Sequence, residues 1–396
     1  MKNIKAYRLL SKPQSLASSL FLAISPILIS NNLDAAIALG DKGAVAFRLD
    51  SIFEYVSNTT SSSTGDEDIL GIIQPDIVYK FDAGDLNIDA FVGYQFREYD
   101  EQSEFDSQNF KSGFEISYPN LEDQSYEIKL DGGYNESTRS DPDLLTIVEK
   151  EVTNLNGSGS FIFADRYVIK GQVRYQNEEV EDTPPFIFSD VETLALPVDF
   201  FYRYSETLAF GLGYRYRTTE VEGPNPAADS VDHAYYFALE GELTPIIDAD
   251  LRIGFQNRNF DSDQYEDTDS FFSEISVGWT ISDQSRLQFT GGQEFDTSAA
   301  NRSIETLYAD VKLSHRFDEK ISGYALVGYE ENEYSTLRGD PVREDEKVIF
   351  ELSTDYILIE DRLTLSGLFR YSDQTSDLDT AEYDRLVILL GLNLIY

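Results

Sequence analysis

The chain has 396 residues, with 72 acidic and 31 basic side chains and a formal net charge of −41. It contains no cysteine, which excludes disulfides and a lipid-anchored lipoprotein, and its acidity argues against the basic patches that bind nucleic acid. The mean hydropathy is slightly polar despite 25 tyrosines and 26 phenylalanines, so the composition is not that of a helical membrane protein.

The first 38 residues have the organisation of a secretory signal peptide. Basic residues between Lys2 and Lys12 precede an apolar core within residues 15–30, and Ala36-Ile37-Ala38 fits the small-x-small cleavage pattern. The core is too short and too interrupted to span a bilayer as a helix. We therefore predict a signal peptide over residues 1–38 and one domain over residues 39–396. A buried N-terminal helix is the alternative.

From about Ala44 onward, segments that alternate between apolar and polar residues follow one another along the chain. They are about 10 to 14 residues long, and short turns alternate with longer acidic loops between them. The short turns recur about every 35 to 45 residues, so each interval holds two strands. A β-propeller repeats at a similar period, but its strands are shorter, and no blade motif such as a Trp-Asp pair recurs.

This pattern predicts about 18 strands, with 16 as the alternative count. In the first strand, Asp50-Ser51 interrupts the alternation and predicts a β-bulge. The predicted strands are 44–56, 69–81, 86–98, 107–118, 124–137, 149–163, 167–179, 188–203, 207–220, 231–243, 249–260, 268–281, 286–297, 303–316, 321–334, 343–357, 361–373 and 382–396.

Each predicted strand has one apolar face and one face of polar, charged or glycine residues. Leu208, Phe210 and Leu212, for example, alternate with residues that include Gly211 and Gly213. A water-soluble β-sandwich would turn the apolar face inward. The length of the strands and the charge and glycine content of the polar face favour lipid on the apolar side instead.

Aromatic residues near the strand ends form two groups if odd strands run outward and even strands return. Tyr134 and Tyr216 then fall at the outer interface, and Trp279 and Tyr396 at the periplasmic interface. These groups are typical of the two aromatic girdles of a barrel. An even strand count places both termini on the periplasmic side.

The last strand has an apolar face that runs from Leu386 to Tyr396, and it resembles the C-terminal strand of bacterial outer-membrane barrels. An unpaired strand edge in hydrocarbon costs several kcal/mol per group, so this strand must pair with the first one. We predict an all-β fold, a transmembrane antiparallel up-and-down β-barrel whose lumen is wide enough for water.

Most basic residues of the predicted strands fall on the polar face, together with acidic partners. Such groups either create a transverse field in a channel or pair to brace its wall, and the sequence leaves both open. The candidate pore-lining residues are Arg97, Lys129, Lys170, Arg174, Arg203, Arg215, Arg217, Arg252, Lys312, Arg370, Glu115, Asp131, Glu294 and Glu351.

The longer loops carry most of the net charge. One of them could bind calcium diffusely through carboxylate oxygen, but it lacks the glycine and spacing of an EF-hand, so no specific metal site is predicted. The alternative is a solvated rim that resists aggregation. The acidic residues of this loop are Asp261, Asp263, Glu266, Asp267 and Asp269.

Enzyme chemistry has little support in this sequence. The chain has two histidines, and each shares a register with apolar residues, which places it on the outer wall. Some lipid hydrolases are barrels with a serine and a histidine on that wall, and Ser230 and Asp232 lie near His233. No nucleophile motif surrounds them. We predict neither an enzymatic activity nor a cofactor.

The mature region resembles the putative beta-barrel porin-2 family of Gram-negative bacteria. The motifs that carry this resemblance are clearest in the final third: residues 324–330, residues 363–371, Arg370-Tyr371-Ser372 and Glu382-Tyr383-Asp384-Arg385. The resemblance implies an outer-membrane conduit, in a family whose members often accompany exopolysaccharide gene clusters and work above a periplasmic polysaccharide export protein.

The expected function is therefore a passive outer-membrane pore for exopolysaccharide. A general diffusion porin and a structural or surface-binding barrel are the alternatives. Expected partners are outer-membrane lipid and lipopolysaccharide, the barrel assembly machinery, the periplasmic export protein and the polysaccharide itself.

Overall fold

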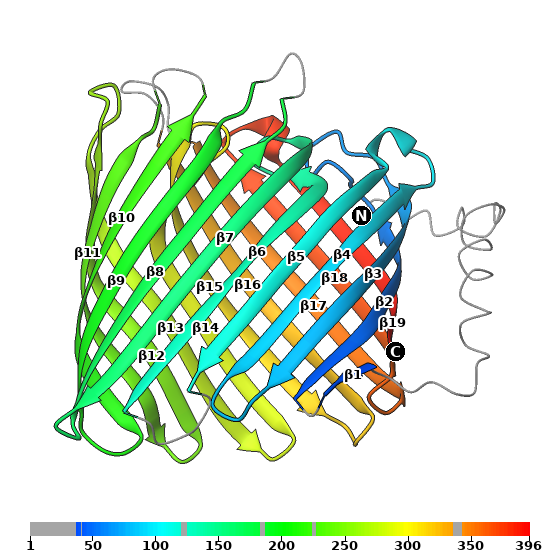
Figure 1. Ribbon diagram of the computed structural model, residues 1–396. Coiled ribbons are helices and arrows are strands. Elements are labelled where there is room, and N and C mark those ends of the chain that lie inside the picture. The colour runs from blue at the N-terminus through cyan, green and yellow to red at the C-terminus, as the bar shows by residue number, and fades with distance from the viewer. Residues whose placement is uncertain (1–36, 41, 120–124, 183–186, 224–226, 336–342) are drawn as a thin grey trace.

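The computed structural model describes residues 37–40, 42–119, 125–182, 187–223, 227–335 and 343–396. Within them, β2 to β19 form one closed antiparallel barrel of 18 strands, and the short β1 pairs with β2 (Figure 1). The predicted fold and the strand count of 18 are confirmed. The predicted signal peptide lies outside the described residues, apart from Ile37 and Ala38, and it stays a prediction.

The strands are long, and each pairs with its neighbour along the chain. Their bounds are β1 Ile37–Leu39, β2 Gly43–Val56, β3 Asp68–Asp82, β4 Asn87–Tyr99, β5 Ser107–Tyr118, β6 Tyr126–Asp141, β7 Thr146–Phe163, β8 Tyr167–Val180, β9 Asp190–Arg203, β10 Leu208–Glu222, β11 Ser230–Thr244, β12 Ile247–Phe260, β13 Thr268–Ser282, β14 Ser285–Ser298, β15 Arg302–Arg316, β16 Ile321–Ser335, β17 Arg343–Ile359, β18 Leu363–Ser376 and β19 Tyr383–Ile395. Two short 3-10 helices, η2 Ser103–Phe105 and η3 Asp379–Ala381, lie in loops.

The ring closes between the last strand and β2. The β19–β2 pairing runs from Val387 opposite Val56 to Ile395 opposite Arg48. Phe47 and Tyr396 extend it by exchanging two backbone hydrogen bonds of 2.7 Å. No edge is left at this seam, as the cost of unpaired groups in hydrocarbon requires.

The bulge predicted at Asp50-Ser51 is wrong. The β2–β3 register continues without a shift from Gly43 opposite Phe81 to Val56 opposite Asp68. Asp50 keeps its regular inward position because it has polar partners there: Asn393 donates a hydrogen bond to its carboxylate, and Arg48 Nε lies 3.8 Å from it. The strand therefore needs no extra residue to place this charge away from lipid.

The outer face of the barrel is apolar. Leu212 is 68% exposed, Phe255 74% and Leu390 57%, and each lies on the face opposite the charged side chains. Apolar surface on this scale is unfavourable in water at roughly 25 cal/mol per Å², so it indicates contact with lipid. Among the described residues, no helix is long and apolar enough to cross a membrane.

The two ends of the barrel differ. The short turns, β1 and the C-terminus gather at one end, and the longer loops at the other (Figure 1). In outer-membrane barrels the end with longer loops faces outside. We call it the outer mouth.

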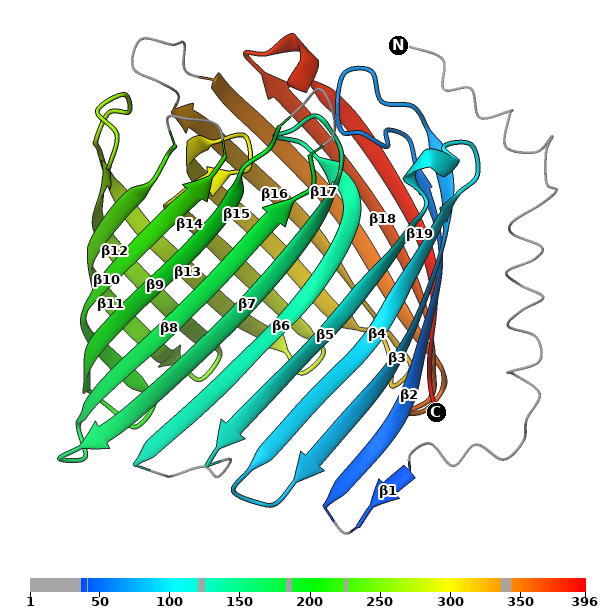
Figure 2. The same cartoon turned by 45° about the horizontal axis from the view of Figure 1, so that its top comes forward.

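Two hairpins separate from the preceding strand before they reach the outer mouth (Figure 2). The β5–β6 pairing ends at Asn135, whereas β6 stays paired with β7 up to Asp141. The β13–β14 pairing ends at Gln293, whereas β14 stays paired with β15 up to Ser298. Residues 136–149 are called the β6 arm and residues 294–303 the β14 arm.

Candidate functional site: a lumen narrowed by two inward arms

The β14 arm presents two backbone carbonyls to arginines of the wall. Arg217 Nη2 donates to the Phe295 carbonyl at 2.6 Å, and Arg258 Nη1 donates to the Asp296 carbonyl at 2.7 Å. These arginines belong to β10 and β12, so the arm lies over the inner face of those strands. An unpaired carbonyl away from water is unfavourable, and a guanidinium satisfies it with a charge-assisted hydrogen bond. The two arginines therefore hold the arm inside the barrel.

The same two arginines share one buried carboxylate. Arg258 and Asp232 are each only 1% exposed. Arg258 Nε donates to Asp232 Oδ1 and Arg217 Nε donates to Oδ2, both at 2.7 Å. The Arg258 guanidinium also lies 4.9 Å from the ring centroid of Phe295. Loss of one member of such a buried network costs about 3–5 kcal/mol, because the remaining charge is left unpaired.

The tip of the β14 arm contacts three neighbouring loops. The Ala299 carbonyl accepts a hydrogen bond from Ser189 N at 2.8 Å, and Asn301 Oδ1 accepts one from Ala228 N at 2.9 Å. Tyr265 Oη donates to the Asn301 carbonyl at 3.1 Å. The arm is thus held at its base by arginines and at its tip by loop backbone.

The β6 arm is joined to the wall in a similar way, but with fewer charges. Arg97 Nη1 donates to the Thr138 carbonyl at 3.2 Å, on the edge that β5 has left. Thr138 Oγ1 donates to Asn109 Oδ1 at 3.1 Å, and Phe110 N donates to Glu136 Oε2 at 2.7 Å. Side chains therefore replace the backbone pairing that ends at this point.

The tip of the β6 arm crosses the lumen. Tyr334 of β16 donates a hydrogen bond to Asp143, and β16 lies half of the ring away from β7. Leu144 packs against a cluster that contains Val180 and Ala299, so the two arms also meet each other. The outer mouth is therefore narrowed from two sides.

Asp143 is the titratable group at this crossing. Burial and the neighbouring Asp141 carboxylate raise the pKa of Asp143 to about 6. The hydrogen bond from Tyr334 and the positive charges of Arg343 and Lys150 act in the opposite direction and are outweighed. A carboxyl that titrates near neutral pH thus holds the tip to the opposite wall.

Among the predicted pore-lining residues, Arg215, Arg217 and Glu294 come together on the inner face. Arg215 is 4% exposed, and its Nη1 lies 3.0 Å from Glu294 Oε2. Arg217 Nη1 lies 3.9 Å from the same carboxylate oxygen, and the Arg215 guanidinium packs over the Phe272 ring at 4.6 Å. These arginines brace the narrowed region rather than face open solvent.

Four further predicted residues, Lys170, Arg252, Arg370 and Glu351, lie on the inner face in ion pairs. Lys170 Nζ lies 2.6 Å from Glu240, and Arg252 Nη1 lies 2.7 Å from Asp250. Arg370 pairs with Glu351, which also accepts a hydrogen bond from Tyr324.

The remaining predicted residues are spread around the lumen and are not brought together. Lys129 pairs with Glu127 at 2.8 Å, Asp131 accepts a hydrogen bond from Asn156 at 2.8 Å, and Glu115 stands in register between Asp89 and Asp131. The other contacts are Arg174 to Gln172 at 2.8 Å, Arg203 to the Glu206 carbonyl at 3.1 Å, Lys312 over the Tyr324 ring at 3.9 Å, and Arg97 to Thr138 as described.

The sequence pattern does not reveal the inward arms, because it places residues 138–148 in a loop between two predicted strands. A signal was present: Gly132-Gly133 and Gly291-Gly292 are the chain's two adjacent glycine pairs, and each precedes a point of separation. A Cβ at Gly292 would lie 2.7 Å from the Ser273 carbonyl oxygen, and one at Gly132 would lie 2.9 Å from that of Asn154. Glycine lets the backbones approach closely where the strand bends.

The acidic loop after β12 shows no preformed metal site. Across the described ranges, no group of three or more His, Cys, Asp or Glu residues is arranged to hold a metal ion. One of its carboxylates is engaged locally, since Asp267 Oδ1 accepts a hydrogen bond from Phe260 N at 3.0 Å. Diffuse association of cations with this loop stays a prediction.

The residues considered for a hydrolase site around His233 are not assembled. His233 Nδ1 lies 2.7 Å from Tyr214 Oη on the outer face, whereas Asp232 and Ser230 belong to the inner face. A serine–histidine pair does occur at the opposite end, where Ser285 Oγ lies 2.8 Å from His315 Nδ1.

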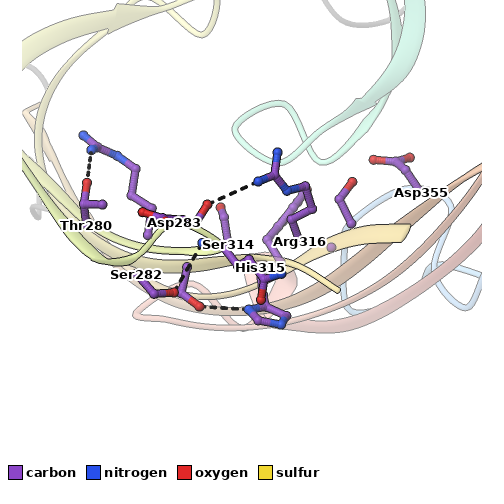
Figure 3. Close-up of a pocket in the computed structure, with 13 residues that line it drawn as sticks. Thr280, Ser282, Asp283, Ser314, His315, Arg316 and Asp355 are labelled. Carbon is purple, nitrogen blue, oxygen red and sulfur yellow. Dashed lines mark hydrogen bonds between the residues drawn. The ribbon is translucent and has the colours of Figure 1, made fainter. Parts of the chain in front are cut away.

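Ser285 and His315 both line a pocket of about 460 Å³ formed by the short-turn ends of β13 to β17 (Figure 3). Phe317 packs edge-on against the His315 ring at 4.6 Å, and no carboxylate of the described residues contacts that ring. In the same pocket Arg316 donates to the Asp283 carbonyl at 3.4 Å. The pair joins β14 to β15 and, among the described residues, has no third member to orient the imidazole.

Comparison with known structures finds similar barrels. OccK2 (OpdF) of Pseudomonas aeruginosa has a TM-score of 0.50 and 11% identity, over 88% of this chain and 97% of that one. The outer membrane protein OpdK of the same organism has a TM-score of 0.49 and 8% identity, over 88% and 98%. OccK5 (OpdH), also from P. aeruginosa, has a TM-score of 0.47 and 8% identity, over 89% and 98%. No curated protein matches the sequence.

The family comparison agrees with the resemblance seen in the sequence. Residues 201–396 match the model of the family described as Putative beta-barrel porin 2, which covers β10 to β19 and only the end of β9. This fold and family indicate a channel of the outer membrane rather than an enzyme. Through residues 201–396, the chain belongs to the putative beta-barrel porin 2 family.

Proposed function

We propose that this protein is a passive channel that conducts exopolysaccharide across the outer membrane. The observation that best supports a channel is the polarity of the inner face. This face carries polar and charged side chains around the ring, while the outer face is apolar. A polar lumen inside a closed barrel admits water and hydrophilic solutes.

Exopolysaccharide is the substrate favoured by the family resemblance. A polysaccharide needs a route lined with hydrogen-bonding groups and no energised step at the outer membrane if a periplasmic export protein delivers it. The lumen supplies hydrogen-bonding side chains that include Gln74, Gln95, Asn156 and Gln172. These side chains match the hydroxyl groups of a sugar chain.

A general diffusion porin for small solutes is the alternative, and one observation favours it. The β6 and β14 arms meet at the outer mouth through Leu144 and Ala299, which limits the size of a solute that passes while they are in contact. Export of a polymer requires a mouth that is wide enough beside the arms or that widens when they separate.

Two experiments test the proposal in sequence. Purified full-length protein in planar bilayers should give discrete conductance steps, and their absence would reject the channel and favour a structural or surface-binding barrel. In the native host, deletion of the gene should reduce secreted polysaccharide and leave periplasmic polysaccharide raised. Unchanged secretion would reject export, and liposome swelling with sugars of graded size would then define a diffusion porin.

A further inference from the structure

The inner face carries two kinds of cationic region. On β8 to β12, the five cations Lys170, Arg215, Arg217, Arg252 and Arg258 each have an acidic group within 4 Å. At the root of the β6 arm, Arg97, Lys111 and Arg139 have none among the described residues. We call these three residues the basic cluster.

The topology brings the basic cluster to one place. Lys111 of β5 stands in register between Gly93 of β4 and Asn135 of β6. Arg97 and Arg139 each lie four residues further toward the outer mouth on those two strands. The Arg97 bond to the Thr138 carbonyl places its guanidinium beside Arg139, and Lys111 is close enough to experience the repulsion of both.

The two carboxylates whose charge acts on Lys111 do not neutralise the basic cluster. Asp76 accepts hydrogen bonds from Arg48 Nε at 2.8 Å and from Gln74 at 3.1 Å, and Asp50 accepts one from Asn393. Both carboxylates therefore already have partners. Three like charges held together without a counter-charge repel one another, so a ligand that bears negative charge is favoured there.

One buried donor in the cluster has no acceptor. Arg97 Nε is inaccessible to water and makes no hydrogen bond among the described residues. A buried charged donor without a partner is costly, and in native proteins it usually meets a water molecule or an ion. Arg139 is exposed and Lys111 half-buried, so a ligand reaches the cluster from the lumen.

We propose that Arg97, Lys111 and Arg139 form a binding subsite for carboxylate groups of a solute that passes the outer mouth. Guanidinium groups bind carboxylates with paired, charge-assisted hydrogen bonds, and the lysine adds a point charge. The carboxylate belongs either to a uronic acid unit of a polysaccharide or to a free sugar acid. The subsite deepens the proposed function, and it gives an acidic chain of net charge −41 a place that retains anions.

Current block in planar bilayers tests the subsite with three probes: hexagalacturonate, galacturonate and neutral maltohexaose. Hexagalacturonate should interrupt the current of the native channel. The triple variant Arg97→Gln, Lys111→Gln, Arg139→Gln should weaken this block at least about tenfold, since three charge-assisted contacts are lost. Block by galacturonate at similar concentration would assign the subsite to free sugar acids. Equal block by maltohexaose, or block unaffected by the triple variant, would overturn the proposal.

A charge-matched control separates the cluster from the general field of the lumen. The variant Arg174→Gln, Arg203→Gln, Lys312→Gln removes the same charge from scattered inner positions and should keep the hexagalacturonate block within about twofold. Equal loss in both variants would show a diffuse field and overturn the subsite.

Two further measurements keep the test independent of folding and of conduction. If the triple variant loses the heat-modifiable gel mobility of a folded barrel, Arg139→Gln replaces it, because Arg139 is exposed and should still weaken the block about threefold. If the protein does not conduct, calorimetric titration of detergent-solubilised protein with hexagalacturonate measures binding directly. Binding without conduction would reject the channel alone, and absence of binding would reject the subsite.

Discussion

The β6 and β14 arms are built on the same plan but held with different strength. Each follows a glycine pair, leaves the preceding strand and stays paired with the following one. The β14 arm is fixed by Arg217 and Arg258, which share the buried Asp232. The β6 arm has one guanidinium contact at its root and a single tyrosine–aspartate bond at its tip. We therefore expect the β14 arm to be held rigidly at the outer mouth and the β6 arm to move more easily.

The largest test of this difference is Asp232→Ala. Removal of the shared carboxylate leaves the buried Arg258 guanidinium without a counter-charge and Arg217 with only Glu294 at 3.9 Å, so it should lower the free energy of unfolding by about 3–5 kcal/mol. Urea titration of the protein in lipid vesicles measures this. Asp131→Ala is the matched control, because Asp131 is half-buried with one contact to Asn156, and it should cost less than about 1 kcal/mol. Similar losses in both variants would contradict a rigidly held β14 arm.

The next test is the pH dependence of the β6 tip. The docked tip has an Asp143 pKa of about 6, above the 3.8 of a solvated carboxyl, so docking binds a proton more tightly. Docking is therefore most favoured below pH 4 and loses this contribution as pH rises through 6, by about 3 kcal/mol in full.

Spin labels can follow this docking, because the chain has no native cysteine. With Pro142→Cys and Glu333→Cys labelled, the distance distribution should be narrow and short at pH 5 and broader at pH 8. Asp143→Asn should remove the change with pH. A distribution that is the same at both pH values in the unaltered background would show that the tip is fixed as firmly as the β14 arm.

The glycine pairs give a smaller and more local test. Gly292→Val introduces side-chain atoms against the Ser273 carbonyl and the Tyr308 ring and should destabilise by about 2–3 kcal/mol. Gly132→Val meets slightly longer contacts and should cost about 1–2 kcal/mol. Gly171→Val is the control, since nothing lies within 4 Å of a Cβ there. The measurement is the order of the three unfolding midpoints in urea. If Gly292→Val leaves the midpoint unchanged, the glycine pair is not what allows the strand to bend.

The smallest expected effect is that of Glu136→Ala. Phe110 N loses its acceptor, which costs about 1 kcal/mol, and its amide should exchange faster with solvent. Hydrogen exchange of residues 107–110 checks this, with the fully paired residues 112–116 as the internal reference. Unchanged protection at Phe110 would mean that Glu136 does not replace the lost backbone partner.

The strands, their number and the closing pair were predictable from the sequence because a period of two is imposed by lipid on one side and water on the other. The inward arms were not, because alternation persists where a hairpin leaves the wall. Tyr134, Glu136 and Thr138 continue the pattern of the strand, and only the glycine pair marks the change. β6 extends to Asp141, four residues past its predicted end.

The burial of the charged side chains on the inner face could not be predicted from the sequence either. Arg217 and Lys129 stand at equivalent positions in the alternation, yet Arg217 is 8% exposed and Lys129 has a side chain that is 49% exposed. Their exposure differs because the β14 arm covers Arg217 and no arm covers Lys129. Whether an arm covers a residue depends on contacts between strands that are far apart in the chain.

The two points where strands separate make the barrel mechanically uneven. Below Asn135 and Gln293, widening the ring would break backbone pairs between neighbouring strands. Above them, on two sides, the wall is joined by side chains such as Gln293, which donates to Ser270 Oγ of β13 at 3.4 Å. At these two sites the upper ring can therefore widen without breaking pairs between neighbouring strands, at the cost of the contacts that hold the two arms.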